Sequence, residues 1–193
     1  MGPSDWELVQ QSRGGDRDAF RTLVERYQRK VAALALGMLR NPEDALDVVQ
    51  DTFAKAYQSL DRFKGDAAFY TWVYRIAVNL CIDVQRREAK MPQVGLELRE
   101  GEDGAEQDLP AAVAHGADPE DPFRRARDAE IARGIQQAVS ELTPEHRAVI
   151  LLREVEGLSY EEISRVLDCP KGTVMSRLHY ARKQLQERLR GLR

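Results

Sequence analysis

Residues 158–193 restrict the fold of this chain more than any other stretch, because they have the pattern of two helices separated by a tight turn. Ser159 and Glu162 form an S-x-x-E capping box, which predicts a helix start at this point. The sequence Asp-Cys-Pro at residues 168–170 interrupts the pattern, since proline lacks an amide hydrogen but suits the first turn of a new helix. After it, apolar residues recur with the spacing of one helical face: Val174, Leu178, Ala181 and Leu185.

The second of these helices carries the charge expected of a helix that enters the major groove of DNA. Residues 170–193 contain seven Lys or Arg and one acidic residue, a balance of +6 that suits contact with phosphates. We expect seven side chains off the apolar face to lie nearest the DNA: Lys171, Thr173, Ser176, Arg177, His179, Tyr180 and Lys183. An ordinary helical hairpin with a solvated charged face has the same periodicity, so the pattern alone leaves both interpretations open.

Acidic residues gather in one segment that has no helical periodicity. Residues 97–121 contain nine Asp or Glu and one Arg; because the whole chain carries −3 and this segment −8, the remainder carries +5. Glycine, alanine and proline are frequent between residues 91 and 122, which favours a flexible linker kept extended by charge repulsion. We therefore predict two domains, residues 1–90 and 123–193, joined by a flexible acidic linker over residues 91–122.

Helical periodicity accounts for both predicted domains, and no segment reads as a strand, so we predict an all-α fold. About three helices precede the linker and four follow it. Residues 1–14 are expected to be a short lead-in or a frayed helix. Asn41 and Pro42 suit an N-cap and first helical position, and they predict a helix to about residue 60. The expected buried side chains are Leu46, Val49, Phe53, Ala56 (or Tyr57) and Leu60 in that helix, and Ala126, Ile131, Ile135, Ala138, Val139, Leu142, Val149, Ile150, Leu152 and Val155 after the linker.

Residues 67–90 combine aromatic and cationic side chains on one predicted helix. This combination suits single-stranded nucleic acid, because bases stack on aromatic rings while cations hold the backbone. We expect Phe69 and Trp72 to lie in the core, and Tyr70 and Tyr74 to be the exposed rings. An asparagine later in this helix has an amide that can read a base edge.

The residue types that commonly carry out catalysis or bind metals are scattered along the chain and form no recognisable site. None of His115, His146 and His179 lies near a serine, cysteine or carboxylate in a nucleophile arrangement, and the chain has no phosphate-binding glycine loop or clustered Cys/His site. Cys81 and Cys169 are far apart, which fits a reducing cytoplasm. No apolar run approaches the roughly 20 residues of a membrane span. We therefore expect a cytoplasmic protein that is not an enzyme and has no cofactor, metal site or membrane contact of its own.

Four motifs in order, from about Asp16 to Leu189, resemble bacterial RNA polymerase sigma factors of the extracytoplasmic-function (ECF) group. They are GDRDAFRTLVERYQ, NPEDALDVVQDTFAKAYQSLDRF, FYTWVYRIAVNLCIDVQRR and LSYEEISRVLDCPKGTVMSRLHYARKQL. The resemblance implies an alternative sigma factor that binds core RNA polymerase and directs promoter-specific transcription initiation. In this family the amino-terminal domain, region 2, recognises and opens the −10 element, and the carboxy-terminal domain, region 4, reads the −35 element with its helix-turn-helix.

The resemblance also implies roles for individual residues. The helix at residues 42–60 matches the one that binds the clamp of the polymerase β′ subunit, with Asp47, Gln50, Asp51 and Phe53 at the motif. Residues 70–87 match the −10 segment, in which Tyr70, Tyr74, Arg75, Asn79, Arg86 and Arg87 are expected to contact DNA. Asn79 falls where the family lines a pocket for a flipped-out base. Ser176 and Arg177 belong to the TVxSR motif of the −35 helix.

Further partners follow from the resemblance: the polymerase β flap, promoter DNA and a cognate anti-sigma factor held between the two domains. Two other interpretations remain open from the residues themselves. A dimeric helix-turn-helix regulator would bind palindromic DNA without polymerase, whereas a protein-binding module would use the aromatic segment only as core. A sigma factor differs from both because its promoter recognition depends on polymerase.

Overall fold

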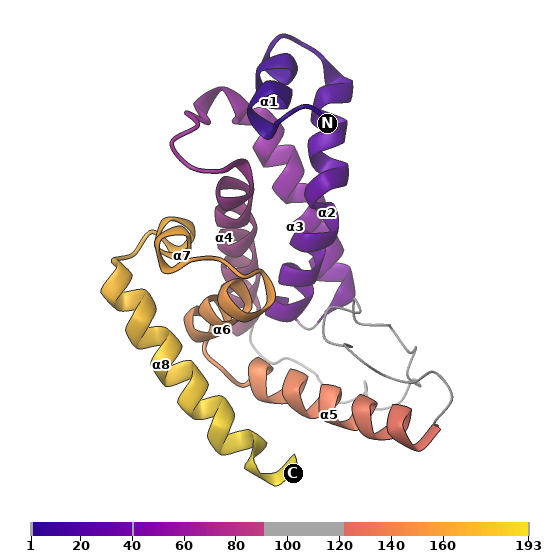
Figure 1. Ribbon diagram of the computed structural model, residues 1–193, viewed down its shortest axis with the longest axis vertical. Coiled ribbons are helices and arrows are strands. Elements are labelled where there is room, and N and C mark those ends of the chain that lie inside the picture. The colour runs from indigo at the N-terminus through magenta and orange to yellow at the C-terminus, as the bar shows by residue number, and fades with distance from the viewer. Residues whose placement is uncertain (1, 40, 91–121, 193) are drawn as a thin grey trace.

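The computed structural model describes residues 2–39, 41–90 and 122–192, and every regular element within these ranges is helical (Figure 1). The first unit, before residue 91, contains α1 (Asp5–Arg13), α2 (Arg17–Leu39), α3 (Pro42–Gln58), the short 3-10 turn η1 (Leu60–Arg62) and α4 (Phe69–Lys90). The second unit contains α5 (Pro122–Ser140), α6 (Pro144–Ile150), the π-helical segment η2 (Leu151–Val155), α7 (Tyr160–Leu167), α8 (Lys171–Arg188) and the 3-10 turn η3 (Leu189–Leu192). The expected all-α fold with two helical regions is confirmed. The linker predicted over residues 91–122 lies outside the described residues, apart from Pro122.

Helix α2 is the centre of the first unit, because it contacts α1, α3 and α4. Its buried side chains recur at helical spacing and include Leu23, Tyr27, Val31, Leu34 and Met38. Helix α3 begins at the predicted N-cap, where the Asn41 side chain accepts a hydrogen bond of 3.0 Å from the Glu43 amide.

Helix α1 is firmly attached to this unit, so the expectation of a lead-in or frayed helix was wrong. Ser4 and Glu7 form a capping box at its start. Its last residue, Arg13, donates hydrogen bonds to the carbonyl oxygens of Leu60 and Phe63 in the segment that precedes α4. The side chain at the end of α1 thereby fixes the loop that leads into α4.

Aromatic rings pack around the start of α4. The ring centroid of Phe63 lies 5.7 Å from that of Phe69 and 5.2 Å from that of Trp72, and Phe69 lies 5.8 Å from Tyr27. Phe69 is buried and Trp72 packs against the core, as expected for both residues. Pairs of this kind contribute about 0.5–1.5 kcal/mol beyond the area they bury, so the cluster stabilises the entry to α4.

Capping signals fix the breaks between helices of the second unit. The Thr143 side chain accepts a hydrogen bond from the His146 amide at the start of α6, and Ser159 and Glu162 form the predicted capping box of α7. Helix α7 ends at Asp168, whose φ of 50° lies in the left-handed region that Asp and Asn adopt more readily than other side chains. Helix α8 begins after a three-residue turn, at Lys171, which confirms the helix-turn-helix.

The two units share one continuous apolar core in this structure. Helix α7 packs against α4, while α6 and η2 contact α2 (Figure 1). Gly37 in α2 permits the close approach of η2, because a Cβ at this position would lie 2.8 Å from a δ-carbon of Leu151. The second unit therefore rests on α2 and α4 at the same time.

A buried guanidinium joins the units at one end of this interface. The Arg147 side chain is only 7% exposed. Its nitrogens donate to the carbonyl oxygens of Val139 (3.2 Å), Ser140 and Leu142 (3.0 Å) in the second unit, and to that of Met38 in the first. These carbonyls supply the polar partners that a buried cation requires.

Three side chains predicted in the core lie at the surface instead: Leu46, Ile135 and Val155. Of the two alternatives given for α3, Ala56 is buried and Tyr57 is exposed. On α3 the buried face consists of Ala45, Val48, Thr52, Phe53 and Ala56, so Leu46 falls just outside it. Val155 lies in the π-helical segment, whose wider turn breaks the 3.6-residue period used for the prediction. The other expected core residues are buried or half-buried: Val49, Phe53, Ala56, Leu60, Ile131, Ala138, Val139, Leu142, Val149, Ile150 and Leu152. The side chain of Ala126 lies outside the described residues.

We expect Arg147→Met to destabilise the protein, because it keeps the aliphatic packing but removes a donor from four carbonyl oxygens, two of them in buried hydrogen bonds. A loss of about 2 kcal/mol in the free energy of unfolding is expected. Urea denaturation followed by circular dichroism measures it. Arg29→Met, on an exposed face of α2, is the matched control and should change the value by less than about 0.5 kcal/mol. Equal stability of the two variants would contradict the role given to Arg147.

Candidate nucleic-acid interface

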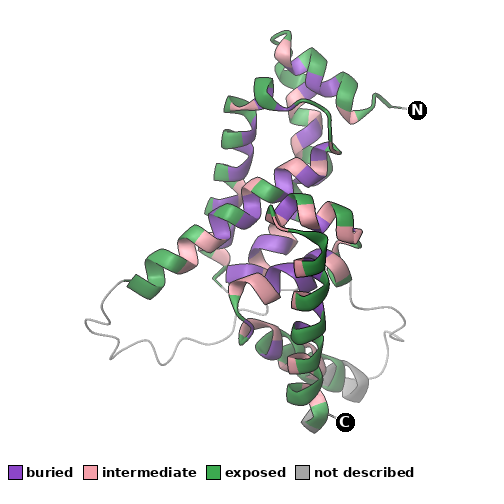
Figure 2. Cartoon of the chain, turned by 90° about the vertical axis from the view of Figure 1, so that its left-hand side faces the viewer, coloured by how far each residue is buried: buried purple, intermediate pink, exposed green. Residues whose placement is uncertain are grey.

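Helix α8 presents an exposed polar face along most of its length (Figure 2). Val174, Leu178 and Ala181 are buried against the second unit, which confirms the predicted apolar stripe. Five of the predicted DNA contacts are exposed and two are half-buried on the remaining faces: Lys171, Ser176, His179, Tyr180 and Lys183, then Thr173 and Arg177. The rings of His179 and Tyr180 lie 5.7 Å apart, between centroids. The structure thus brings the predicted −35 residues together on one helix.

Some Lys and Arg side chains of α8 are paired with carboxylates and others are not. The Lys171 ammonium pairs with Glu161 on α7, and Arg182 pairs with Glu154 at 2.6 Å, each within the second unit. Arg188 likewise pairs with Glu141 at 2.6 Å. Among the residues that the structure describes, neither Arg177 nor Lys183 is paired with a carboxylate, so these two remain available to phosphate.

Helix α4 presents two different faces, so the predicted −10 residues do not form a single surface. Arg75 and Asn79, one helical turn apart, are exposed on one face. Arg86 and Arg87 are exposed further along the helix. The remaining two predicted contacts, Tyr70 and Tyr74, lie on the face that is packed within the molecule.

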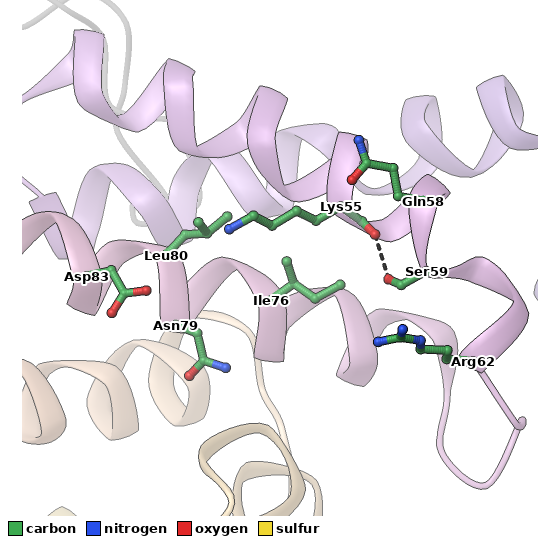
Figure 3. A pocket seen from close by; sticks show the side chains of 8 residues that line it. All are labelled: Lys55, Gln58, Ser59, Arg62, Ile76, Asn79, Leu80 and Asp83. Carbon is green, nitrogen blue, oxygen red and sulfur yellow. Dashed lines mark hydrogen bonds between the residues drawn. The ribbon is translucent and has the colours of Figure 1, made fainter.

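A hollow of about 490 Å³ opens beside Asn79, between the end of α3 and α4 (Figure 3). It is lined by Lys55, Gln58, Ser59, Arg62, Ile76, Asn79, Leu80 and Asp83. In the described part of the chain the Asn79 amide has no hydrogen-bond partner, so it is free to bond a ligand. Its lining has two cations, Lys55 and Arg62, one carboxylate, Asp83, and several neutral polar groups. The two cations suit a phosphate and the neutral polar groups suit a base.

The positions of Tyr70 and Tyr74 correct the expectation that both rings are exposed. Tyr74 is only 2% exposed and its hydroxyl donates to Glu156, the residue directly after η2. Tyr70 is half-buried and its hydroxyl donates to Glu162 of α7. Their ring centroids are 6.2 Å apart. The sequence gives no signal of this burial, because it depends on the packing of the second unit against α4.

Proton positions at these contacts follow from burial and hydrogen bonding. Burial, and then the bond to Glu156, raise the pKa of Tyr74, while the bond to Glu162 is the main cause that raises the pKa of Tyr70. Bonds from Tyr70 and Ser159 lower the pKa of Glu162. Burial raises the pKa of Glu156, although the bond from Tyr74 and the charge of Lys30 oppose it. The tyrosines are therefore protonated donors at neutral pH.

An acidic surface covers one side of α3. Asp47, Gln50 and Asp51 are exposed there, as predicted for the polymerase contact. Phe53 does not belong to this surface, because its ring is buried in the core of the first unit and supports the helix from behind. Leu46, at 60% exposure, lies among the acidic residues instead. Leu46 was predicted in the core, but the buried face of α3 passes through its neighbour Ala45.

The described residues offer little sign of a metal site, a reactive thiol or a membrane-spanning helix. They contain no group of three or more His, Cys, Asp or Glu that could hold a metal ion. Burial raises the pKa of the Cys81 thiol to about 12, which disfavours its reactive thiolate form. Within the same ranges of the chain, no helix is both long and apolar enough to cross a membrane.

Comparisons with known proteins match both units. Residues 23–91 match the family model described as Sigma-70 region 2, and residues 132–185 match Sigma-70, region 4. The chain is 39% identical to the ECF RNA polymerase sigma-E factor of Haemophilus influenzae, over 98% of this chain and 97% of the relative. It is 37% identical to the RNA polymerase sigma-H factor of Pseudomonas aeruginosa, over 97% and 95% of the two chains.

Solved structures share the same arrangement of helices. CnrH, solved in complex with the cytosolic domain of CnrY, matches with a TM-score of 0.65 and 29% identity over 97% of both chains. The sigma factor RpoE of Bartonella quintana, solved with the anti-sigma factor NepR, has the same fold, with a TM-score of 0.65 at 24% identity over 88% of this chain and 96% of that one. Because its relatives are nearly 40% identical over almost their whole length, this chain belongs to the ECF family of RNA polymerase sigma factors.

Proposed function

We propose that this chain is an alternative sigma factor that binds core RNA polymerase and directs promoter-specific initiation through the −35 and −10 elements. The observation that carries the proposal is the presence, in one chain, of an exposed basic recognition helix and a separate helix with an exposed Arg-Asn face beside a polar hollow. A sigma factor needs both, because duplex and opened DNA are read by different chemistry.

The −35 element is read by α8. The exposed Ser176 and the half-buried Arg177 lie near its amino-terminal end, where a recognition helix contacts base edges. Lys183 lies two turns further along and contacts phosphate. Base edges and phosphates are thus contacted by different side chains of α8. The contacts with phosphates make the affinity for DNA depend on salt concentration.

The −10 element is read by α4 after the duplex opens. Asn79 bonds the edge of a base extruded into the hollow, and Lys55 and Arg62 at the rim neutralise the neighbouring phosphates. Arg75, Arg86 and Arg87 hold the rest of the strand. Extruding a base costs a few kcal/mol, so the pocket contacts must be made at the moment the promoter opens.

The acidic surface of α3 binds the clamp of the polymerase β′ subunit. Asp47 and Asp51 supply charge that favours a basic partner, while Leu46 supplies the apolar centre that such interfaces require. The protein acts in the cytoplasm, where polymerase is, and catalyses no reaction itself. Region 4 reaches the β flap.

A cognate anti-sigma factor is the remaining partner. RpoE of Bartonella quintana was solved with the anti-sigma factor NepR, and CnrH with the cytosolic domain of CnrY. The overall likeness of this chain to CnrH at 29% identity supports control by a protein of the same kind. Family membership over the full length disfavours a polymerase-independent dimeric regulator.

Arg177→Ala should weaken protection of the −35 element by the holoenzyme about tenfold, because it removes a cation that lacks a carboxylate partner within the described chain. Footprinting on promoter DNA with polymerase present measures the effect. Arg182→Ala is the control, since Glu154 already holds that guanidinium. An unchanged footprint for Arg177→Ala would refute its assignment.

Asn79→Ala should reduce promoter opening about tenfold while leaving the fold intact, because the side chain is exposed and supports no described hydrogen bond. Permanganate reactivity of unpaired thymines reports opening, and circular dichroism reports folding. The control is Glu88→Ala, at an exposed site near the end of the same helix. Normal opening in the Asn79 variant would remove this residue from the base pocket.

Asp51→Lys should weaken binding of core polymerase about tenfold by reversing one charge of the acidic α3 surface. Competition for core polymerase, followed by fluorescence anisotropy of labelled protein, measures the affinity. Glu25→Lys makes the same charge change on an exposed face of α2 and should leave the affinity unaltered. If both variants lose affinity equally, overall charge rather than this surface determines binding.

A further inference from the structure

The short η1 turn forms part of one wall of the hollow beside Asn79. Arg62 and the neighbouring Ser59 line the hollow from this side (Figure 3). Along the turn, the Arg62 amide donates to the Ser59 carbonyl at 2.9 Å, and the Phe63 amide donates to the Leu60 carbonyl at 3.1 Å. A 3-10 turn of three residues has poorer hydrogen-bond geometry than an α-helix, so its position depends on contacts from elsewhere in the fold.

Arg13, at the end of α1, supplies such contacts. Its Nη2 donates to the carbonyl oxygens of Leu60 at 2.8 Å, of Asp61 at 3.3 Å and of Phe63, and its Nε donates to Leu60 at 3.2 Å. Donor and acceptors are 47 to 50 residues apart in the chain. The three carbonyls lie on both sides of Arg62, so one charged donor fixes the backbone that carries the Arg62 side chain.

The loop after the turn is covered by a residue from the start of α1. The Trp6 ring lies against Gly65, where a Cβ would be 2.7 Å from a ring carbon. Gly65 has a φ of 78°, which glycine adopts without strain. The Trp6 ring is 6.2 Å from that of Phe63, between centroids, and the Arg13 guanidinium lies over it at 5.8 Å. Helix α1 thus contacts the backbone between α3 and α4 at two places.

The attachment of α1 to the first unit does not depend on Arg13. The apolar side of α1 is buried in the common core. Asp5 accepts hydrogen bonds from the Tyr27 hydroxyl and from Arg26, both on α2. Within the described chain, the hydrogen bonds of the Arg13 side chain all go to the backbone of residues 60–63. Arg13 therefore acts on the turn rather than on the anchoring of its own helix.

We propose that Arg13 is a positioning residue for the hollow, because it holds the η1 turn where Arg62 can meet the backbone of a strand whose base enters beside Asn79. The proposal rests on the proposed function for the nature of the ligand, whereas the hold on the turn is independent of it. The Arg62 side chain is exposed and extends from η1 along the hollow (Figure 3). A long side chain binds better from a fixed backbone, since less freedom is lost on binding.

Arg13→Met tests the hold on the turn in the free, full-length chain. The Arg13 side chain is 22% exposed, so methionine can keep its aliphatic packing. Amide hydrogen exchange of residues 60–66 should become about fivefold faster, because the turn opens more often. Exchange in α8 should stay the same. Arg21→Met is the matched control, since it removes the same charge from an exposed pair with Asp18 and should leave both regions unaltered.

Promoter opening by the holoenzyme tests the consequence for the hollow. Arg13→Met and Arg62→Ala should each slow opening about fivefold, followed by permanganate reactivity at saturating holoenzyme. The double variant should also be slowed about fivefold, because Arg13 acts through Arg62. Independent effects, such as a general loss of stability, would multiply to about 25-fold. Protection of the −35 element should be the same in all these variants and in Arg21→Met.

The two measurements together decide between the outcomes. Faster exchange with coupled effects on opening supports the proposal. Unchanged exchange in Arg13→Met overturns it, because other contacts would then hold the turn. Multiplied effects, or normal opening in Arg13→Met when Arg62→Ala slows it, overturn it as well. If exchange is faster while Arg62→Ala and Asn79→Ala both open promoters normally, Arg13 does hold the turn and the −10 assignment of the proposed function is wrong.

Discussion

The packing of α4 on two sides is the constraint on which the rest of the structure depends. One side completes the core of the first unit with α2 and α3, and another receives α7 of the second unit. Asn79 is left to solvent, as are Arg86 and Arg87 further along the helix. A single helix thus supplies core residues, a docking face and a candidate reading face, and a change on one face affects the others through the same backbone.

Local signals in the sequence predicted the elements well, because capping and periodicity act over a few residues. The Asn41 N-cap, the Ser159–Glu162 capping box and the apolar stripe of α8 all have the predicted geometry. The capping box at Ser4 and Glu7 has the same signature and was missed because so short a helix lacks a long apolar stripe. Local rules therefore account for where helices begin and end.

Properties that arise from long-range packing were not predictable in this way. Tyr74 is buried by the second unit, and Arg147 is buried because it finds carbonyl partners in both units. Leu46 is exposed, and Phe53 is buried and so cannot join the polymerase contact, since the buried face of α3 is set by its fit to α2 and α4. Of the candidate site, the −35 helix followed from the sequence, whereas the division of α4 into two faces required the fold.

Gly37 has a consequence for how such a chain can vary. Because Gly37 has no side chain, η2 can lie close to α2. This contact is far along the chain from Asp168, whose carboxylate pairs with Arg75 of α4. A larger residue at position 37 would push η2 away from α2. Loss of the Asp168 carboxylate would instead remove an exposed ion pair with Arg75. Neither position belongs to the exposed face of α8 or to the Asn79 hollow. Mutations at these positions would therefore alter the fit between the two units without changing the side chains predicted to contact the promoter.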